Sequence, residues 1–475
     1  MQNQKSMADI PYLSATEMLD QFRHRKMSPS EACEAVLAHI ARWEPRLQAL
    51  YAFDPEGARG AAKASTERWA KGAPQGALDG VPVTIKENIA TKGVPVPLGC
   101  AATDHTPAPE DAPPAARLRE SGAVILGKTT MPDYGMLSSG LSSFHALTRN
   151  PWNLALNPGG SSAGAAAAGA AGYGPIHIGT DIGGSVRLPA GWCALVGLKP
   201  SLGRVPIDPP YIGRIAGPLT RTVADNALAM SVLSGADWRD GTSLPPASLD
   251  WTMTPAEVRG LRIGVQLEIG AGLDVQPETR AAVAAAAKLF ERAGATLVPV
   301  TPVLTRAMLD GLDQFWRARA WADIEPLPVE RRSRILPYIR KWAESGARVS
   351  GPEAVRGFGQ TFAMRKAAGA LFQRIDALLS PTAPMPAFPA ELASPIDDPE
   401  RPFEHIGFTV VWNMTDQPAV SINCGFTSDG LPIGLQIVGK RFDDVGVLRL
   451  AAAYETWRGP GRAWPTPDPP LKQAH

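Results

Sequence analysis

The sequence has few of the residue types that build disulfide frameworks and metal sites. Of its 475 residues, only four are cysteine and seven are histidine. The cysteines lie far apart and form no C-x-x-C pair; they are Cys33, Cys100, Cys193 and Cys424. This spacing argues against a zinc site and against disulfides, and a reducing compartment fits it. We therefore expect no metal ion and no other cofactor.

A charge excess and a long apolar run are also missing. Lys and Arg number 47 against 46 Asp and Glu, which gives a net charge of +1 without long runs of one sign. A surface for nucleic acid or anionic lipid is therefore not expected. Residues 1–5 do not open a signal peptide, and no apolar run approaches the roughly 18 residues of a spanning helix. We expect a cytoplasmic monomer or homodimer that acts on a small molecule, without nucleic-acid or membrane partners.

Alternating helix and strand patterns predict an α/β fold. Residues 28–31 form a capping box that begins a helix, and Pro45 predicts its end. Residues 80–86 alternate apolar and polar side chains, which predicts a strand that ends at Lys86. Helix-then-strand patterns follow at 115–120 with 123–126, and at 278–292 with 296–300. This order is typical of a layered fold with a parallel or mixed sheet.

Two longer segments have unusual compositions. Residues 157–184 are almost entirely Gly, Ala and Ser apart from a strand-like stretch at 175–178. A flexible linker has a similar composition, but the apolar residues that follow favour a packed core in which backbones approach closely. Residues 302–375 are instead rich in Arg, Trp and other bulky residues, which predicts a helical insert or cap.

Two short motifs match known signatures without their required context. Residues 122–129 read G-x-x-x-x-G-K-T, but the four variable residues form a strand rather than a phosphate-binding turn, so nucleotide binding is rejected. Residues 160–164 read G-x-S-x-G with Ser162 as the nucleophile of an α/β-hydrolase esterase. No apolar strand leads into Ser162, and only His177, His405 and His475 follow it. His177 within an apolar strand is typical of a core residue, so this alternative is the weaker one.

A third combination of residues resembles the amidase signature family. It consists of Lys86, Gly159-Gly160-Ser161-Ser162 and the segment 179–189, with 75 residues between Lys86 and Ser161 and 24 between Ser161 and Ser185. Further matches lie at 197–200, 203–206, 217–225, 417–421 and 430–436. The resemblance implies a large central mixed β-sheet covered by helices on both faces. We expect one domain over 1–475, with a helical region at 1–70, a signature core at 80–230 and a variable insert at 302–375.

The resemblance also implies a catalytic triad. Ser185 is the nucleophile, Ser161 relays the proton after a cis peptide bond, and Lys86 is the base. A serine needs a base to become nucleophilic, and a buried lysine can be neutral because burial penalises the ammonium form. The implied oxyanion hole consists of the backbone N–H groups of Ile182, Gly183, Gly184 and Ser185. Asp181 and Arg187 flank the nucleophile, and we expect an ion pair that holds the glycine loop.

The resemblance implies cleavage of an amide C–N bond through an acyl-enzyme. Carbamates and esters present the same carbonyl geometry and are further candidate substrates. A glutaminase-type subunit of a tRNA-dependent amidotransferase is the main alternative, but Ile182 and Leu188 replace the Thr and Gln of glutamine-using relatives. We therefore expect small apolar or aryl amides. The expected lining of the substrate pocket is Tyr134, Gly135, Met136, Leu137, Trp316 and Trp321.

Overall fold

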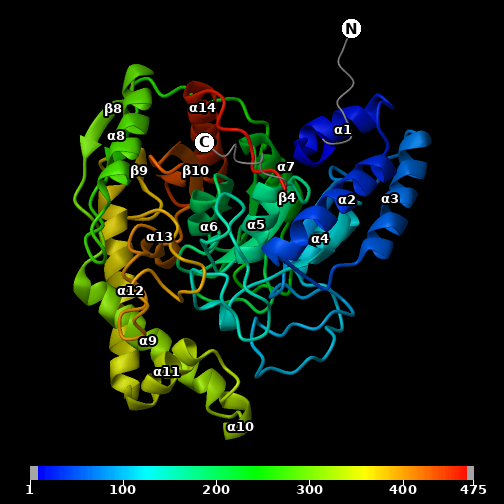
Figure 1. Ribbon diagram of the computed structural model, residues 1–475. Coiled ribbons are helices and arrows are strands. Elements are labelled where there is room, and N and C mark those ends of the chain that lie inside the picture. The colour runs from blue at the N-terminus through cyan, green and yellow to red at the C-terminus, as the bar shows by residue number, and fades with distance from the viewer. Residues whose placement is uncertain (1–8, 468–475) are drawn as a thin grey trace, which may run out of the picture.

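The computed structural model describes residues 9–467, and eleven strands within this range form one sheet (Figure 1). The strands are β1 (Leu50–Tyr51), β2 (Pro82–Lys86), β3 (Val124–Thr129), β4 (Ile176–Asp181), β5 (Val196–Lys199), β6 (Ile215–Thr220), β7 (Arg262–Val265), β8 (Thr296–Pro299), β9 (Ala377–Pro381), β10 (Ala419–Phe426) and β11 (Pro432–Val438). Their order is β1-β3-β2-β4-β6-β5-β10-β11-β9-β7-β8. Strand β2 is parallel to β3 and β4, and β7 is parallel to β8 and β9, while the other pairs are antiparallel. The predicted mixed sheet is confirmed.

Helices cover both faces of this sheet. They are α1 (Ala15–Arg23), α2 (Pro29–Leu47), α3 (Pro55–Ala70), α4 (Pro113–Glu120), α5 (Ala163–Ala171), α6 (Arg187–Trp192), α7 (Val223–Leu233), α8 (Pro277–Arg292), α9 (Arg306–Ile324), α10 (Val329–Arg332), α11 (Pro337–Ser345), α12 (Gly351–Leu371), α13 (Val410–Met414) and α14 (Asp444–Arg458). Alternate residues of β3 show the two layers, because successive side chains of a strand point to opposite faces. Ile125 packs against an apolar cluster to which α4, α7, α8 and α14 contribute, whereas Val124 and Leu126 belong to another cluster, to which α2, α3 and α5 contribute.

The segment of small side chains is a packed core element. Helix α5 is buried along its whole length, and β4 follows it. A Cβ atom on Gly164 would lie 2.5 Å from the backbone nitrogen of Thr130 and closer still to the carbonyl oxygen of Ala49. Small residues therefore let α5 approach the sheet more closely than ordinary side chains allow.

Helices α9 to α12 occupy the expected helical insert. In Figure 1 they run along one side of the molecule, and α9 packs against both α11 and α12. Their bulky side chains build one apolar cluster, in which Leu312, Trp316 and Trp342 are buried. This cluster continues into α13, so the insert packs beside the centre of the molecule.

Two element boundaries differ from the sequence-based prediction. Helix α2 begins at the predicted capping box of Ser28 but continues past Pro45 to Leu47. Proline is tolerated there because it falls in the last turn, where only one backbone hydrogen bond is lost. Strand β3 extends three residues beyond the predicted end and includes Lys128 and Thr129. The P-loop-like motif is therefore strand to its last residue, which confirms its rejection.

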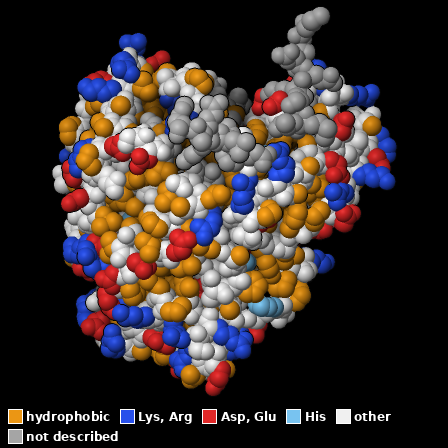
Figure 2. Space-filling view, in the orientation of Figure 1, with side chains coloured by type: hydrophobic (Ala, Val, Ile, Leu, Met, Phe, Trp, Pro, Cys, Tyr) orange, Lys and Arg blue, Asp and Glu red, His pale blue; other side chains and the backbone are white. Residues whose placement is uncertain are grey.

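The outer surface carries mixed charge. Figure 2 shows Lys and Arg side chains interspersed with Asp and Glu over the visible face, in keeping with the net charge of +1. Over residues 9–467, none of the helices combines the length and apolarity needed to cross a bilayer.

Candidate active site

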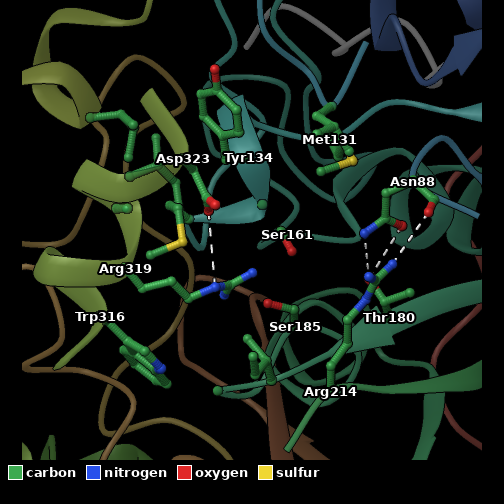
Figure 3. Close-up of a pocket in the computed structure, with 18 of the residues that line it drawn as sticks. Asn88, Met131, Tyr134, Ser161, Thr180, Ser185, Arg214, Trp316, Arg319 and Asp323 are labelled. Atoms are coloured by element: carbon green, nitrogen blue, oxygen red, sulfur yellow. Dashed lines mark hydrogen bonds and ion pairs between the residues drawn. The ribbon is translucent and has the colours of Figure 1, made fainter. Parts of the chain in front are cut away.

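A cavity of about 650 Å³ lies where the ends of β2 and β4 meet α9 and the loop before β6 (Figure 3). Ser161 and Ser185 both line it, and Figure 3 shows the two side chains next to each other on its wall. They are largely buried, with 3% and 9% of their surfaces exposed. The fold therefore places two of the three predicted catalytic residues in one cavity.

A glycine turn positions Ser185 just before α6. Gly184 has a φ of +131°, a backbone conformation that favours glycine. A Cβ atom there would lie 2.5 Å from Thr409 Oγ1, so the close packing also requires the absence of a side chain. The turn brings Ser185 to the cavity wall at the amino end of α6.

Lys86 ends β2 directly behind Ser161. Its side chain is fully buried, and Nζ lies 2.8 Å from Ser161 Oγ, 3.1 Å from Ser162 Oγ and 3.0 Å from Thr180 Oγ1. Burial lowers the pKa of Lys86 well below its usual value, and the positive charge of Arg214 lowers it further. The peptide bond between Gly160 and Ser161 is cis, as the family resemblance implied. Lys86 is thus a buried amine with a low proton affinity in contact with Ser161.

The glycine loop offers three free backbone donors. The N–H groups of Ile182, Gly183 and Ser185 donate no hydrogen bond within residues 9–467. The N–H of Gly184, predicted as a fourth donor, instead donates to Asp181 Oδ1 at 2.8 Å. The prediction is therefore corrected for Gly184, because the Asp181 carboxylate accepts its N–H, while Ile182, Gly183 and Ser185 remain predicted donors.

Asp181 and Arg187 form the ion pair expected beside the nucleophile. Arg187 Nη2 lies 3.0 Å from Asp181 Oδ1, and both side chains are completely buried. Burial alone would raise the pKa of Asp181, but the charge of Arg187 and its hydrogen bonds outweigh it and hold the pKa far below the usual range. The Asp181 carboxylate also accepts backbone N–H groups of the loop and thereby fixes its shape.

The competing nucleophile, Ser162, does not line the cavity. Its Oγ donates to the carbonyl oxygen of Thr180 at 3.2 Å and accepts the Thr180 N–H at 3.3 Å, and the residue is fully buried. His177 hydrogen-bonds Thr84 Oγ1 at 2.8 Å in the core, where burial lowers its pKa to about 3. His405 lines the cavity and stacks on Trp192, but it makes no hydrogen bond to a serine of the described chain. His475 lies outside the described residues.

Most of the predicted pocket residues line the cavity. Tyr134, Gly135, Met136, Leu137 and Trp316 are all part of its wall. Trp321 is not, and the prediction was wrong for this residue: its ring lies under the guanidinium of Arg332 at a separate depression. Five residues along a helix rotate a side chain by about 140° from Trp316, which turns Trp321 away from the cavity.

Several residues of the cavity, polar and apolar, were missed. On α9, Arg319, Ala320, Asp323 and Ile324 follow Trp316 on the cavity-facing side. Their spacing of three, four, seven and eight residues is a helical face, so the sequence did contain the signal for them. Asn88 and Arg214 also line the cavity from loops after β2 and before β6. No sequence pattern places these loops together.

Comparisons with known proteins show which sequences and structures the chain is similar to. The Amidase family matches residues 31–448. A glutamyl-tRNA(Gln) amidotransferase subunit of Myxococcus xanthus is 36% identical, with 93% of this chain and 96% of that protein covered. An acylamidase of Rhodococcus erythropolis is 34% identical, with 95% and 96% covered. The crystal structure of a bacterial aryl acylamidase of the amidase signature family superposes with a TM-score of 0.86 at 31% identity, covering 94% and 96%.

Proposed function

The chain belongs to the amidase signature family, whose enzymes act on amide C–N bonds, and on this basis we propose that it hydrolyses small amides through Ser185, Ser161 and Lys86. The observation that carries the proposal is the contact of 2.8 Å between the buried Lys86 amine and Ser161, which shares a cavity wall with Ser185. A neutral lysine amine with a hydroxyl relay supplies the base that a serine nucleophile requires.

The first half of the proposed reaction forms an acyl-enzyme. Lys86 takes the proton of Ser161 while Ser161 takes that of Ser185, and Ser185 Oγ bonds to the carbonyl carbon. The free N–H groups of the glycine loop stabilise the oxygen as it becomes negative; one such donor contributes roughly 3 kcal/mol. Ser161 then donates a proton to the nitrogen as the C–N bond breaks and regains one from Lys86, because an amide anion is a very poor leaving group.

Water completes the reaction. It loses a proton to Ser161 and Lys86 while its oxygen bonds to the acyl carbon. The bond to Ser185 breaks, Ser185 regains a proton from Ser161 as Lys86 returns its proton to Ser161, and the carboxylic acid leaves. The amine and the acid together account for all atoms of the amide and one water molecule.

The cavity wall favours a substrate with an apolar body. Besides the predicted residues, its lining includes Leu98, Met131, Ile339, Trp342 and Phe403. Such a surface binds aryl or alkyl groups by removing them from water. The likeness to an acylamidase and to an aryl acylamidase supports the same class, and carbamates and esters of similar shape are further substrates under this proposal.

A second candidate function is that of a glutamine-hydrolysing component of an amidotransferase. The observation in its favour is the 36% identity to the Myxococcus xanthus protein over 93% of the chain. Under this alternative, glutamine would be hydrolysed and anilides would not. Measuring ammonia release from glutamine beside aniline release from an anilide therefore separates the two functions.

Labelling with a fluorophosphonate tests the nucleophile. We expect wild-type protein to be labelled at Ser185, and Ser185→Ala to lose both the label and aniline release from an anilide. Ser162→Ala is the matched control, because it removes a neighbouring hydroxyl that does not reach the cavity. Labelling that persists in Ser185→Ala and disappears in Ser162→Ala would contradict the proposal.

A further inference from the structure

Two arginine side chains approach the cavity from opposite sides. Arg214 lies in the loop before β6, and Arg319 lies on α9. Both line the cavity, and Figure 3 shows their guanidinium groups on either side of the pair formed by Ser161 and Ser185. The triad mechanism uses neither guanidinium group directly, so their placement needs a separate explanation.

Arg214 has no carboxylate partner within the described chain. Its Nη1 and Nη2 donate to the carbonyl oxygens of Pro209 and Asn88, each at 3.3 Å. No Asp or Glu side chain within residues 9–467 lies within 4.0 Å of its guanidinium. Asp208 also lines the cavity but is exposed and forms no ion pair with Arg214. Two long contacts use only part of the five N–H donors of a guanidinium, and the rest are available to a ligand.

Arg319 is only weakly neutralised. Its one ion pair with a described residue runs to Asp323 with a Nε to Oδ2 distance of 3.9 Å, and its guanidinium lies 3.7 Å above the ring of Tyr211. Burial lowers the pKa of Arg214 to about 10, and the like charge of Arg319 contributes to this shift. The two guanidinium groups therefore repel each other, although the Arg319 side chain is 41% exposed to solvent.

Two carboxylates of the cavity offset these charges only in part: Asp208 acts on Arg214 without forming an ion pair, and Asp323 lies 3.9 Å from Arg319. The Asp181 carboxylate is held by Arg187 at 3.0 Å. Lys86 carries little charge when its amine is neutral, so it adds no counter-ion. Within residues 9–467, neither guanidinium has a carboxylate at hydrogen-bond distance, and a bound anion would supply one and remove the mutual repulsion.

We propose that Arg214 and Arg319 form a carboxylate-binding subsite, so that the substrate is an amide with an apolar body and a carboxylate group. Guanidinium groups bind carboxylates with paired, charge-assisted hydrogen bonds, which also fix orientation. The anchored carboxylate would hold the scissile carbonyl beside Ser185. This inference rests on the proposed amide hydrolysis and specifies the substrate class for the same site.

Matched anilides test the subsite. N-phenylsuccinamate carries a carboxylate on its acyl side, and N-phenylpentanamide is a neutral compound of similar length; both release aniline. A second pair, 4-acetamidobenzoate and 4-acetamidobenzamide, carries the difference on the amine side. For at least one pair we expect wild-type kcat/KM to be about tenfold or more higher for the carboxylate, as charge-assisted hydrogen bonds predict. Arg214→Gln is expected to reduce the ratio of kcat/KM for the carboxylate substrate to kcat/KM for its neutral partner about tenfold. Arg319→Gln is expected to reduce this ratio less.

Because the two kcat/KM values of a pair are measured on the same variant, their ratio is unaffected by a change in activity that applies equally to both substrates. Arg332→Gln is the matched control, because it removes the same charge outside the cavity, above Trp321; its ratio should equal that of the wild type. Neutral substrates preferred in both pairs, or ratios unchanged in both cavity variants, would overturn the carboxylate subsite while leaving amide hydrolysis intact. Failure of the wild type to cleave any anilide or to label at Ser185 would instead refute the proposed function.

A binding measurement covers the case in which Arg214→Gln does not fold. Benzoate and benzamide are compared as protectants of wild-type Ser185 against the fluorophosphonate. We expect benzoate to protect at a concentration about tenfold lower, because only benzoate carries the anion. Equal protection by the two compounds would contradict the subsite.

Discussion

Burial alone does not distinguish Lys86 from the other buried lysines of the described chain. Lys86, Lys128 and Lys199 are all buried, and burial lowers the pKa of Lys128 to about 8 and that of Lys199 to about 7. Lys128 donates to the carbonyl oxygen of Ile89, and Lys199 to that of Pro200. Of the three, only Lys86 contacts a serine of the cavity. What distinguishes Lys86 is therefore its partner, Ser161.

The protonation of Lys86 predicts the pH dependence of the enzyme. In the proposed mechanism the base is the neutral amine of Lys86, so kcat/KM should rise with pH through the pKa of Lys86 and level off above it. Because burial lowers this pKa, the midpoint of the rise should lie well below the ordinary value of 10.5. The measurement is kcat/KM for an anilide between about pH 5 and 10. A midpoint at or above 10.5 would contradict a buried neutral amine.

Replacement of Lys86 gives a second prediction at this scale. Lys86→Met and Lys86→Arg should each lower kcat/KM by at least about 100-fold, because methionine accepts no proton and a guanidinium stays protonated. Lys288→Met, at an exposed position on α8, should retain wild-type activity. Activity near the wild-type level in Lys86→Arg would show that another group is the base.

At the scale of elements, close backbone approach decides which glycines are needed. Gly164 of α5 has backbone atoms of Ala49 and Thr130 where its Cβ would be, whereas Gly60 of α3 has nothing within 4 Å. Gly164→Ala should lower the thermal midpoint, with a cost of about 1–3 kcal/mol for overpacking. Gly60→Ala should raise the thermal midpoint slightly, because alanine favours the helix and increases the free energy of unfolding by about 1 kcal/mol. Equal effects of the two substitutions in thermal unfolding would contradict this packing of α5.

At the scale of the whole molecule, one buried ion pair joins distant segments of the chain. Arg187 of α6 pairs with Asp181, and it also donates to Asn413 Oδ1 of α13 at 2.6 Å and to Gln436 Oε1 of β11 at 2.7 Å. Removing one member of such a pair leaves an uncompensated buried charge. Arg187 therefore connects the glycine loop to elements more than 200 residues away in sequence.

Arg187→Met should consequently destabilise the whole fold by about 3–5 kcal/mol. The expected observation is a clear fall in the urea midpoint, together with loss of fluorophosphonate labelling because the loop loses its support. Arg59→Met is the control, since it removes an arginine whose ion pairs with Glu34 and Glu56 are exposed. A midpoint as little affected by Arg187→Met as by Arg59→Met would show that the buried pair does not hold the fold together.

The sequence by itself determined the elements and the local chemistry of the nucleophile. The alternation in residues 80–86 predicted β2, the capping box at Ser28 predicted the start of α2, and the glycine residues before Ser185 predicted a loop with backbone N–H donors. These are local signals, because hydrogen bonds, side-chain direction and backbone freedom depend on residues a few positions apart.

Only the tertiary structure decided what surrounds the nucleophile. It directed the N–H of Gly184 to Asp181, turned Trp321 out of the cavity and brought Arg214 opposite Arg319. Each of these outcomes depends on contacts between segments distant in sequence or on the rotation of a helix face. Local patterns carry no information about such contacts, because burial and electrostatic neighbours are fixed only when the sheet and its helices pack together.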